Sequence, residues 1–410
     1  MRLTISAPPR QPIKASLTIT GSKSESNRLL LLQALYPQIQ ISNLSNADDV
    51  RVMKKGLKVK QGEVDIHHAG TAMRFLTAYF ATRENADVVL TGSSRMQERP
   101  IGILVDALRS LGARISYLDR KGFPPLGIKG TGLEKNEVSL PANISSQYIS
   151  ALLLVAPSLK QGLTLNLEGK ITSRPYIDMT LRLLEEVGIR SEFSGQRIRV
   201  FPEAEIKPNT MVVESDWSSA SYFYSILSLS QIGSEISLSA YKKNSLQGDS
   251  ILQEIYSNFG VETHFEGDSI RLLKAKPHSL SHLEYDLTEA PDLAQTLAVS
   301  CFGLGISCKL SGLHTLKIKE TDRLQALQNE LMKLGGSIST TETSLRLGAR
   351  TALNQGVAID TYNDHRMAMA FAPLGMVTSL IINDAGVVSK SYPDFWEDLR
   401  ALSFDIQEVV

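Results

Sequence analysis

Hydrophobic positions along this chain follow two periods, and a glycine marks each change from one to the other. In four segments, apolar residues recur with the 3.6-residue period of a helix, a glycine follows, and alternating apolar and polar residues then predict a short strand. The segments are residues 104–117, 181–193, 251–265 and 324–341. Glycine suits the left-handed position just after a helix, so we expect each helix to end at its glycine.

These glycines recur at nearly constant spacing, which predicts a repeated structural unit. Gly112, Gly188, Gly260 and Gly335 are separated by 76, 72 and 75 residues. Two weaker segments extend the series, residues 50–59 around Gly56 and residues 395–406, which contain no glycine. Six copies of a unit with one or two helices and several strands fill 410 residues as two groups of three.

The spacing also predicts where the pattern is incomplete and where the chain changes domain. Only 56 residues separate Gly56 from Gly112, so we expect the first unit to lack a strand or hairpin. Residues 8–12 and 237–245 are the best candidates for crossings between two α/β domains. They predict one domain at 20–239 and another built from 1–19 and 240–410, so that the N-terminal strand joins the C-terminal half.

Composition excludes several classes of partner. The chain has 43 basic and 43 acidic residues and is only 6% aromatic, so no global field favours a nucleic acid or an anionic membrane surface. Any cationic site must therefore be local. Coiled-coil heptads are absent, which favours a monomer.

The two cysteines and the apolar runs indicate the compartment. Cys301 and Cys308 lie in one apolar stretch that is typical of buried thiols, not of a redox centre or a disulfide scaffold. No signal-peptide pattern follows Met1, and no apolar run is long enough to span a bilayer. We therefore expect a reducing, cytoplasmic location.

The first candidate site lies at residues 21–28, directly before a run of four leucines. Gly21, Lys23, Ser24 and Arg28 crowd the start of a predicted helix. Backbone N–H groups in a first helical turn lack partners within the helix and carry the positive end of its dipole, so a phosphate or carboxylate can bind there. An ordinary serine cap with solvated charges explains the same residues equally well.

Other predicted helix starts carry similar groups. Thr71 is a candidate cap for the helix after Gly70, and Pro100 suits the first position of the helix after Arg99. Capping alone explains most of these residues. The groups are Gly70 with Thr71, Arg99, Ser145 with Ser146 and Gln147, and Ser173 with Tyr176.

The C-terminal half supplies the acids. Asp292 and Glu320 stand at predicted helix starts, where capping is the simplest role of Asp292. Lys319 and Arg323 are four residues apart, so their charges repel on a helix unless an anion lies between them. His365, Arg366 and Lys390 complete the set. If the helices of each domain point their N-termini toward one mouth, these clusters converge between the domains on a ligand with several anionic groups.

The sequence argues against metal and nucleotide chemistry. His278 and His282 are four residues apart but lie in a predicted turn without acidic or cysteine partners, and His67-His68 has no ligand pattern either. The chain also lacks the glycine-rich phosphate loops of nucleotide hydrolases and of dinucleotide-binding enzymes.

Taken together, the motifs resemble the 5-enolpyruvylshikimate-3-phosphate synthase family. They occur in the order typical of that family and cover about residues 21–395. The resemblance implies a two-domain, inside-out α/β barrel in which each domain consists of three βαβαββ repeats. The motif segments are residues 21–28, 69–74, 98–102, 145–147, 319–323, 363–369 and 390–394.

The resemblance implies transfer of the carboxyvinyl group of phosphoenolpyruvate to the 5-hydroxyl of shikimate 3-phosphate, without a metal or organic cofactor. It also assigns residues to each substrate and to catalysis. The shikimate 3-phosphate ligands are Lys23, Ser24, Arg28, Ser145, Ser146, Gln147, Ser173, Tyr176, Asp292, Thr315 and Lys319. The phosphoenolpyruvate ligands are Lys23, Gly70, Thr71, Arg99, Gln147, Arg323, Arg366 and Lys390. The catalytic residues are Asp292, Glu320, Lys23, Lys390 and His365.

The reaction explains why these residue types are needed. The hydroxyl must lose a proton and the methylene carbon must gain one, so Asp292 is the implied base and Glu320 the implied acid. Crowded cations should lower the pKa of both carboxyls, so Glu320 needs partial desolvation to act as an acid. Lys23, Lys390 and the arginines stabilise anionic charge, and His365 positions Glu320 or the phosphate.

The chain departs from the family pattern at three positions. Thr315 stands where an asparagine is usual, Phe75 where proline is common, and His68 where asparagine is usual. Because Gly70 is retained, we expect inhibition by glyphosate, which occupies the phosphoenolpyruvate site, although Phe75 can shift the helix and weaken it.

Two alternatives remain open. The enolpyruvyl transferase that acts on UDP-N-acetylglucosamine usually has a reactive cysteine before its Arg-Pro, and residues 95–100 contain none. A non-catalytic anion-binding protein with the same fold should have lost the acids, yet Asp292 and Glu320 are present.

Overall fold

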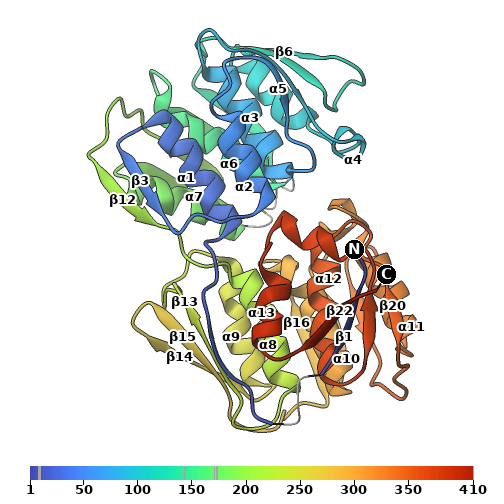
Figure 1. Cartoon of the computed structure of the whole chain (residues 1–410). Coiled ribbons are helices and arrows are strands. Elements are labelled where there is room, and N and C mark those ends of the chain that lie inside the picture. The colour runs from blue at the N-terminus through green and yellow to red at the C-terminus, as the bar shows by residue number, and fades with distance from the viewer. Residues whose placement is uncertain (8–10, 143–144, 170, 172–173, 410) are drawn as a thin grey trace. The chain divides into compact units, whose positions relative to one another are not determined.

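Two crossings divide the chain between two structural units (Figure 1). A computed structural model describes residues 1–7, 11–142, 145–169, 171 and 174–409. One unit, called the N unit here, comprises residues 21–213, and the other, the C unit, comprises residues 1–20 and 214–410. The first crossing lies between residues 20 and 21, not at the candidate segment 8–12, which falls partly outside the described residues.

The second crossing lies earlier than the sequence predicts. It falls between residues 213 and 214, not in 237–245, so residues 214–239 belong to the C unit. Sheet pairing explains the difference, because β13 (Glu235–Ser239) pairs in parallel with β2 (Lys14–Leu17). The N-terminal strand β1 (Leu3–Ser6) does join the C-terminal half, between β21 (Leu380–Ile382) and β22 (Asp405–Glu408).

In its described residues, the N unit contains two four-stranded sheets and one two-stranded sheet, with strand orders β4-β5-β7-β6, β10-β11-β9-β8 and β12-β3. The two-stranded sheet is the incomplete unit predicted from the short first interval. The strands are β3 (Ile39–Ser42), β4 (Gln61–Asp65), β5 (Asp87–Thr91), β6 (Arg114–Tyr117), β7 (Leu126–Lys129), β8 (Glu137–Pro141), β9 (Leu163–Glu168), β10 (Ser191–Ser194), β11 (Arg197–Val200) and β12 (Asn209–Val212). The helices are α1 (Lys23–Leu35), α2 (Asp48–Gly56), α3 (Gly70–Thr82), α4 (Ser94–Gln97), α5 (Gly102–Ser110), α6 (Ser146–Val155) and α7 (Arg174–Glu186).

The described part of the C unit contains three four-stranded sheets, with strand orders β14-β15-β13-β2, β16-β17-β19-β18 and β20-β21-β1-β22. The remaining strands are β14 (Val261–Glu266), β15 (Ser269–Lys274), β16 (His282–Asp286), β17 (Ser307–Ser311), β18 (Ile338–Thr340), β19 (Leu345–Leu347) and β20 (Val357–Ile359). The helices are α8 (Trp217–Leu229), α9 (Leu252–Ser257), α10 (Ala294–Leu304), α11 (Arg323–Lys333), α12 (His365–Phe371) and α13 (Phe395–Ala401). Short 3₁₀ turns include η2 (Gly248–Ile251), η3 (Pro291–Leu293) and η4 (Leu316–Ile318).

The glycine pattern is confirmed at the four strong positions. Gly112, Gly188, Gly260 and Gly335 have φ angles of 112°, 91°, 80° and 95°, each between a helix and a strand. The weaker prediction at Gly56 is confirmed for the helix end, because α2 ends there, but is wrong for the left-handed turn, because Gly56 has no positive φ and an added Cβ would lie 2.6 Å from Leu76 Cδ1. Its role is close packing. In the last segment Ser403 takes the left-handed position instead, with φ 67°.

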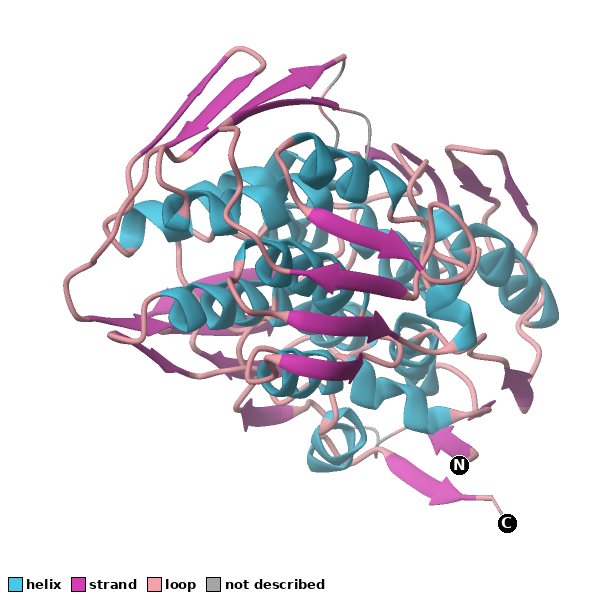
Figure 2. Cartoon of the chain, turned by 90° about the horizontal axis from the view of Figure 1, so that it is seen from above, coloured by secondary structure: helices cyan, strands magenta, loops and turns pink. Residues whose placement is uncertain are grey.

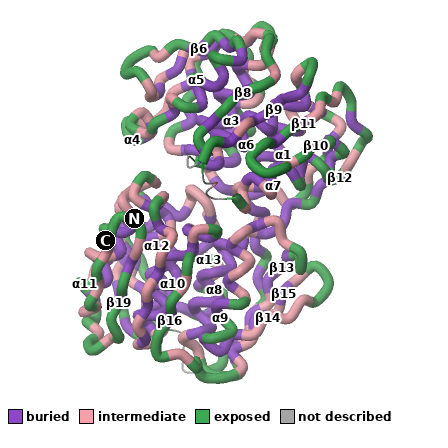
Figure 3. The backbone as a smooth tube through the Cα atoms, turned by 180° about the vertical axis from the view of Figure 1, so that it is seen from behind, coloured by how far each residue is buried: buried purple, intermediate pink, exposed green. Residues whose placement is uncertain are grey.

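Helices form the buried part of each unit, and sheets lie across them (Figure 2). In α6 every residue from Tyr148 to Val155 is buried, and in α8 every residue from Trp217 to Ser228 is buried (Figure 3). Helices without a polar face are expected where neighbours cover them on all sides. The protein is therefore a mixed α/β fold built from repeated βαβαββ-like units and several four-stranded sheets.

Candidate active site

At the start of α1, the N-cap serine does not act as a side-chain cap. Ser22 is the N-cap residue, but its side chain makes no capping hydrogen bond, and its buried hydroxyl has no partner among the described residues. Lys23 Nζ lies 3.6 Å from Asp49 Oδ2 of α2. The first-turn amides of α1 therefore lack a side-chain cap and stand beside a lysine.

Arg28 connects three helices of the N unit. Its Nε donates to Thr180 Oγ1 at 2.8 Å, its Nη2 donates to Ser150 Oγ at 3.1 Å, and its Nη1 donates to the Ser24 carbonyl at 2.8 Å. Burial lowers the pKa of Arg28 to about 10, against the opposing effects of Tyr176 and Glu25. Most of its donors are thus used within the protein, and they fix α1 against α6 and α7.

Gly70 allows an arginine to lie against the start of α3. A Cβ added to Gly70 would lie 2.6 Å from Arg99 Nη1. Arg74, one turn along the helix, donates to the carbonyls of Gly70 at 3.2 Å and Pro100 at 2.9 Å. The structure therefore joins the predicted Gly70 and Arg99 into one cationic corner.

Two capping predictions in this region are wrong. Thr71 does not cap α3, because the helix begins at Gly70 and the Thr71 hydroxyl accepts from Gln147 Nε2 at 3.1 Å. Pro100 is not the first residue of α5, which begins at Gly102, because Ile101 between them has a non-helical φ of −140° and its amide donates to the Gly122 carbonyl. In both cases a contact distant in sequence overrides the local signal.

The start of α6 matches its prediction more closely. Ser145 is the N-cap and its hydroxyl accepts from the Gln147 amide at 3.4 Å, while Ser146 is buried. Tyr176 lies in α7 with its ring 5.9 Å from the Arg28 guanidinium carbon. Ser173 lies outside the described residues.

In the C unit the predicted acids meet three cations, a group called the Asp292 cluster here. Its members are Asp292, Glu320, Asp364, Lys319, Arg323 and Arg366. Arg323 donates to Asp292 at 2.9 Å, to Glu320 at 2.8 Å and to Asp364 at 2.6 Å. Lys319 Nζ lies 3.6 Å from Asp292 Oδ1, and Arg366 Nη2 lies 3.0 Å from Asp292 Oδ2.

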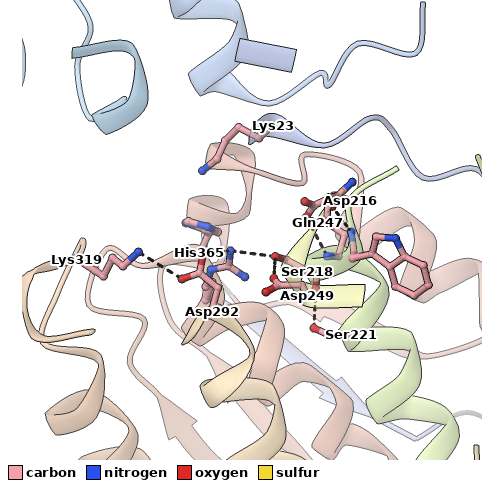
Figure 4. Close-up of polar contacts among 12 residues, drawn as sticks. Lys23, Asp216, Ser218, Ser221, Gln247, Asp249, Asp292, Lys319 and His365 are labelled. Atoms are coloured by element: carbon pink, nitrogen blue, oxygen red, sulfur yellow. Dashed lines mark hydrogen bonds and ion pairs between the residues drawn. The ribbon is translucent and has the colours of Figure 1, made fainter. Parts of the chain in front are cut away.

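This geometry explains the unfavourable charge spacing in the sequence. The anion between Lys319 and Arg323 is Asp292 itself, which lies in η3 and does not act as a helix cap. Figure 4 shows Lys319 reaching Asp292 along one such contact. The negative charge of Asp292 therefore offsets the repulsion between Lys319 and Arg323 that their spacing in the sequence predicts.

The cations set the ionisation of the cluster. Burial raises the pKa of Asp292, but Arg366, Lys319 and Arg323 together outweigh burial and hold that pKa well below its usual value. Burial alone would lower the pKa of Arg323, but Asp364, Glu320 and Asp292 raise it above the usual value. Asp292 is therefore an ionised carboxylate that is held too tightly by cations to be a strong base.

His365 is adjacent in sequence to Asp364 and Arg366 of the cluster, and Lys390 contacts the residue before Asp364. His365 is buried and its Nδ1 lies 3.8 Å from Asp364 Oδ1. Lys390 Nζ donates to the carbonyl of Asn363 at 2.6 Å. Thus Lys390 contacts the loop that leads into Asp364, His365 and Arg366.

The sequence did not single out several residues that organise the C unit. Asp364 lies in the motif at residues 363–369, but the sequence predicted no function for it. In the structure it is fully buried and binds Arg323. Ser218 and Asp249 contact each other, and Ser218 also contacts Arg366. The one local sequence signal that could have identified Asp364 is its position as an acidic residue at a helix start, where its side chain caps α12. Partners distant in sequence have no such signal.

The described residues show neither a metal site nor a membrane-spanning helix. No group of three or more His, Cys, Asp or Glu side chains in those residues has the arrangement of a metal site. Among the same residues, no helix combines the length and apolar character required to cross a bilayer. Both cysteines are free and buried.

Comparison with known proteins identifies the family. The family model described as "EPSP synthase (3-phosphoshikimate 1-carboxyvinyltransferase)" matches residues 55–399. The chain belongs to the EPSP synthase family.

Full-length relatives support this assignment within the EPSP synthase family. A 3-phosphoshikimate 1-carboxyvinyltransferase of Bacteroides fragilis is 46% identical over 413 residues, covering 99% of each chain. One of Vibrio cholerae serotype O1 is 35% identical over 425 residues, covering 96% of this chain and 98% of the relative. The solved EPSP synthase of Acinetobacter baumannii is 21% identical with a TM-score of 0.79 over 100% of both chains, which supports the fold.

Two of the departures from the EPSP synthase pattern can be located in the structure. Thr315 immediately precedes η4, and its Oγ1 is buried without a partner among the described residues. Phe75 is buried within an uninterrupted α3, and its ring centroid lies 5.5 Å from the Arg28 guanidinium carbon. A Phe at this position is therefore compatible with a regular helix.

Proposed function

We propose that this chain transfers the carboxyvinyl group of phosphoenolpyruvate to the 5-hydroxyl of shikimate 3-phosphate through a tetrahedral intermediate, with the residues assigned below. The reaction is that of EC 2.5.1.19, in the shikimate pathway toward aromatic amino acids. The observation that carries the proposal is the Asp292 cluster, in which two candidate proton-transfer groups share one buried arginine within a family member.

The proton transfers follow from the charges of this cluster. Asp292 takes the proton of the attacking hydroxyl, and Glu320 gives a proton to the methylene carbon of phosphoenolpyruvate. While Arg366, Lys319 and Arg323 face Asp292, its pKa is too low for efficient proton abstraction. Substrate anions that draw these cations away raise the pKa of Asp292, so binding itself activates the base.

Binding of shikimate 3-phosphate is assigned mainly to the N unit. Support comes from the uncapped start of α1 beside Lys23 and from the cap of α6. Arg28 is bonded within the protein, so its charge and the helix positions it fixes are its main contributions. The proposed ligands are Lys23, Ser24, Arg28, Ser145, Ser146, Gln147, Ser173, Tyr176, Asp292, Thr315 and Lys319.

Binding of phosphoenolpyruvate is assigned to the cationic corner of the N unit and to the C unit, which also supplies the acids. The close approach of Arg99 to Gly70 supports the first part, and the position of Arg366 supports the second. Lys390, Lys23 and His365 stabilise or position anionic groups. The proposed ligands are Lys23, Gly70, Thr71, Arg99, Gln147, Arg323, Arg366 and Lys390.

The remaining features of the proposal concern the whole protein. The repeats are proposed to form an inside-out α/β barrel in each domain, and the protein is proposed to act as a cytoplasmic monomer. The free thiols of Cys301 and Cys308 support a reducing compartment. The proposed chemistry uses side chains and needs no cofactor.

Phosphate release from phosphoenolpyruvate tests the proposed function. The wild-type protein should release phosphate with shikimate 3-phosphate and not with UDP-N-acetylglucosamine. Asp292→Asn should lower kcat by at least about 100-fold, since one general base contributes 10²–10⁴-fold. Equal release with both acceptors, or no release with either, would contradict the proposal.

A further inference from the structure

Arg366 has a second anchor in the C unit besides Asp292. Its Nη2 donates to Ser218 Oγ at 3.3 Å as well as to Asp292 Oδ2 at 3.0 Å. The Ser218 hydroxyl in turn donates to Asp249 Oδ2 (Figure 4). Because the serine oxygen accepts from the guanidinium, its own proton is directed to Asp249, and the bonds form one ordered chain.

Both ends of the Ser218–Asp249 bond are fixed by other contacts. Ser218 lies in the first turn of α8, which Asp216 caps by accepting from the Ser219 amide at 3.0 Å. Asp249 lies in η2, two residues after Gln247. Gln247 accepts from the Trp217 amide at 2.9 Å and donates to the Ser215 carbonyl at 3.0 Å, so it fastens this turn to the start of α8.

The position of Asp249 is costly for the fold. Its exposed fraction is 6%, and burial, with a contribution from Asp292, raises its pKa to about 7 despite the lowering effects of Arg366 and Ser218. An apolar residue of similar volume is generally no worse for stability than a buried charged group. The arrangement therefore suits orientation of a neighbouring group better than it suits stability.

We propose that Ser218 and Asp249 are positioning residues that hold the Arg366 guanidinium ready to bind the phosphoenolpyruvate anion. This inference rests on the proposed assignment of Arg366 to phosphoenolpyruvate. When the substrate anion replaces Asp292 as a partner of Arg366, the Ser218 contact keeps the guanidinium in place. Asp292 is then released as a base without loss of the orientation of Arg366.

The proposal predicts a substrate-specific defect. Without the Ser218 contact, Asp292 is the remaining partner of the Arg366 guanidinium among the described residues, so phosphoenolpyruvate must both displace that carboxylate and order the arginine. Ser218→Ala and Asp249→Asn should each raise the KM for phosphoenolpyruvate by about tenfold, the effect expected of a hydrogen bond to a charged group. The KM for shikimate 3-phosphate should stay within about twofold of wild type.

Ser228→Ala is the matched control. Ser228 is also a buried serine of α8, but its hydroxyl donates to the Ser225 carbonyl of its own helix. It should leave both KM values unchanged. Urea unfolding of every variant separates stability from positioning, and a parallel rise of both KM values with lost stability would show a merely structural role and overturn the proposal.

A double-mutant cycle distinguishes this inference from the proposed function. Arg366→Ala should raise the KM for phosphoenolpyruvate, and adding Asp249→Asn should have no further effect, because Asp249 acts through the arginine. Additive effects would overturn the positioning role. A normal KM for phosphoenolpyruvate in Arg366→Ala would reject the assignment of Arg366, whereas a defect in Arg366→Ala without one in Ser218→Ala or Asp249→Asn would reject this inference alone.

Discussion

At the scale of single residues, Arg323 is the centre of the charge balance in the C unit. Its side chain is 2% exposed, and its guanidinium bonds Asp292, Glu320 and Asp364. A buried ion pair adds little net stability compared with apolar packing, but removing one partner leaves charges uncompensated in a medium of low dielectric. Here a single removal would affect three carboxylates at once.

Arg323→Met should therefore destabilise the protein by about 3–5 kcal/mol, the range for breaking a buried pair. It should also raise the pKa of Asp292, because a main opponent of burial is lost. Urea unfolding at neutral pH measures the first effect. Arg182→Met, in an exposed pair with Glu185 on α7, is the control and should change stability little. Equal small effects in both variants would contradict this view of Arg323.

Lys274 is a second residue whose burial has a measurable consequence. It is 4% exposed, its Nζ donates to the carbonyls of Ser228 at 2.8 Å and Phe259 at 2.7 Å, and burial lowers its pKa to about 8. Between about pH 8 and the ordinary lysine pKa of 10.5, the unfolded chain binds a proton that the folded protein does not. Stability attributable to Lys274 must therefore rise with pH across this window.

Comparison with Lys274→Met should show that rise. The difference in unfolding free energy between wild type and variant should shift in favour of wild type by roughly 3 kcal/mol at most from pH 8 to pH 10.5, since each pKa unit corresponds to about 1.4 kcal/mol. The exposed Lys243→Met serves as the control and should show a flat difference. If the difference in unfolding free energy between wild type and Lys274→Met did not change with pH, the Lys274 amine would stay charged in the folded wild-type protein.

At the scale of elements, the start of α3 depends on a missing side chain. Gly70 begins the helix, and an added Cβ would lie 2.6 Å from Arg99 Nη1, a mobile end group rather than backbone. The helix can therefore accept alanine while the guanidinium moves. The cost falls on the anion that Arg99 is proposed to bind, not on folding.

Gly70→Ala should raise the KM for phosphoenolpyruvate by about tenfold or more, the loss expected when one charged hydrogen bond is displaced. It should weaken glyphosate inhibition in parallel, because both ligands are proposed to use this corner, and unfolding should stay near wild type. Gly132→Ala is the control, because the nearest described atom to its Cβ would be Glu84 Oε1, at 3.8 Å. Wild-type turnover undiminished at millimolar glyphosate would reject the shared corner.

Local sequence patterns predicted helix ends correctly where short-range interactions determine the conformation. They failed where contacts with residues distant in sequence determine it. The left-handed turns at Gly112 and Gly335 follow from helix termination, which is a short-range effect. Gly56 looked equivalent, but its reason is contact with Leu76 on another helix. Likewise Thr71 carries the signal of a cap yet bonds Gln147, which is 76 residues away.

The candidate site shows the same division. The spacing of Lys319 and Arg323 indicated an anion between them, whereas Asp292, whose simplest local role was capping, received a catalytic role only through the family resemblance. Asp249 and Ser218 were missed, since an acid and a serine near helix starts are ordinary capping residues. Only the fold shows that they meet each other and Arg366.

At the scale of the whole molecule, the proposed ligands of each substrate come from both units. Those of shikimate 3-phosphate include Lys23 and Ser145 of the N unit and Lys319 and Thr315 of the C unit. The chain has no net charge, so local cation clusters, not a global field, must attract the two anionic substrates. A ligand that contacts groups in both units should slow local opening in both.

Hydrogen exchange with and without shikimate 3-phosphate tests this requirement. Saturating ligand should slow exchange at the first turn of α1 in the N unit and at residues 315–323 in the C unit, because amides near bound groups exchange through openings that the ligand opposes. The hairpin of β14 and β15, which contributes no proposed ligand, is the internal control and should be unaffected. Protection confined to the N unit would remove Asp292, Thr315 and Lys319 from the shikimate 3-phosphate ligands, and would leave their charges to act on phosphoenolpyruvate alone.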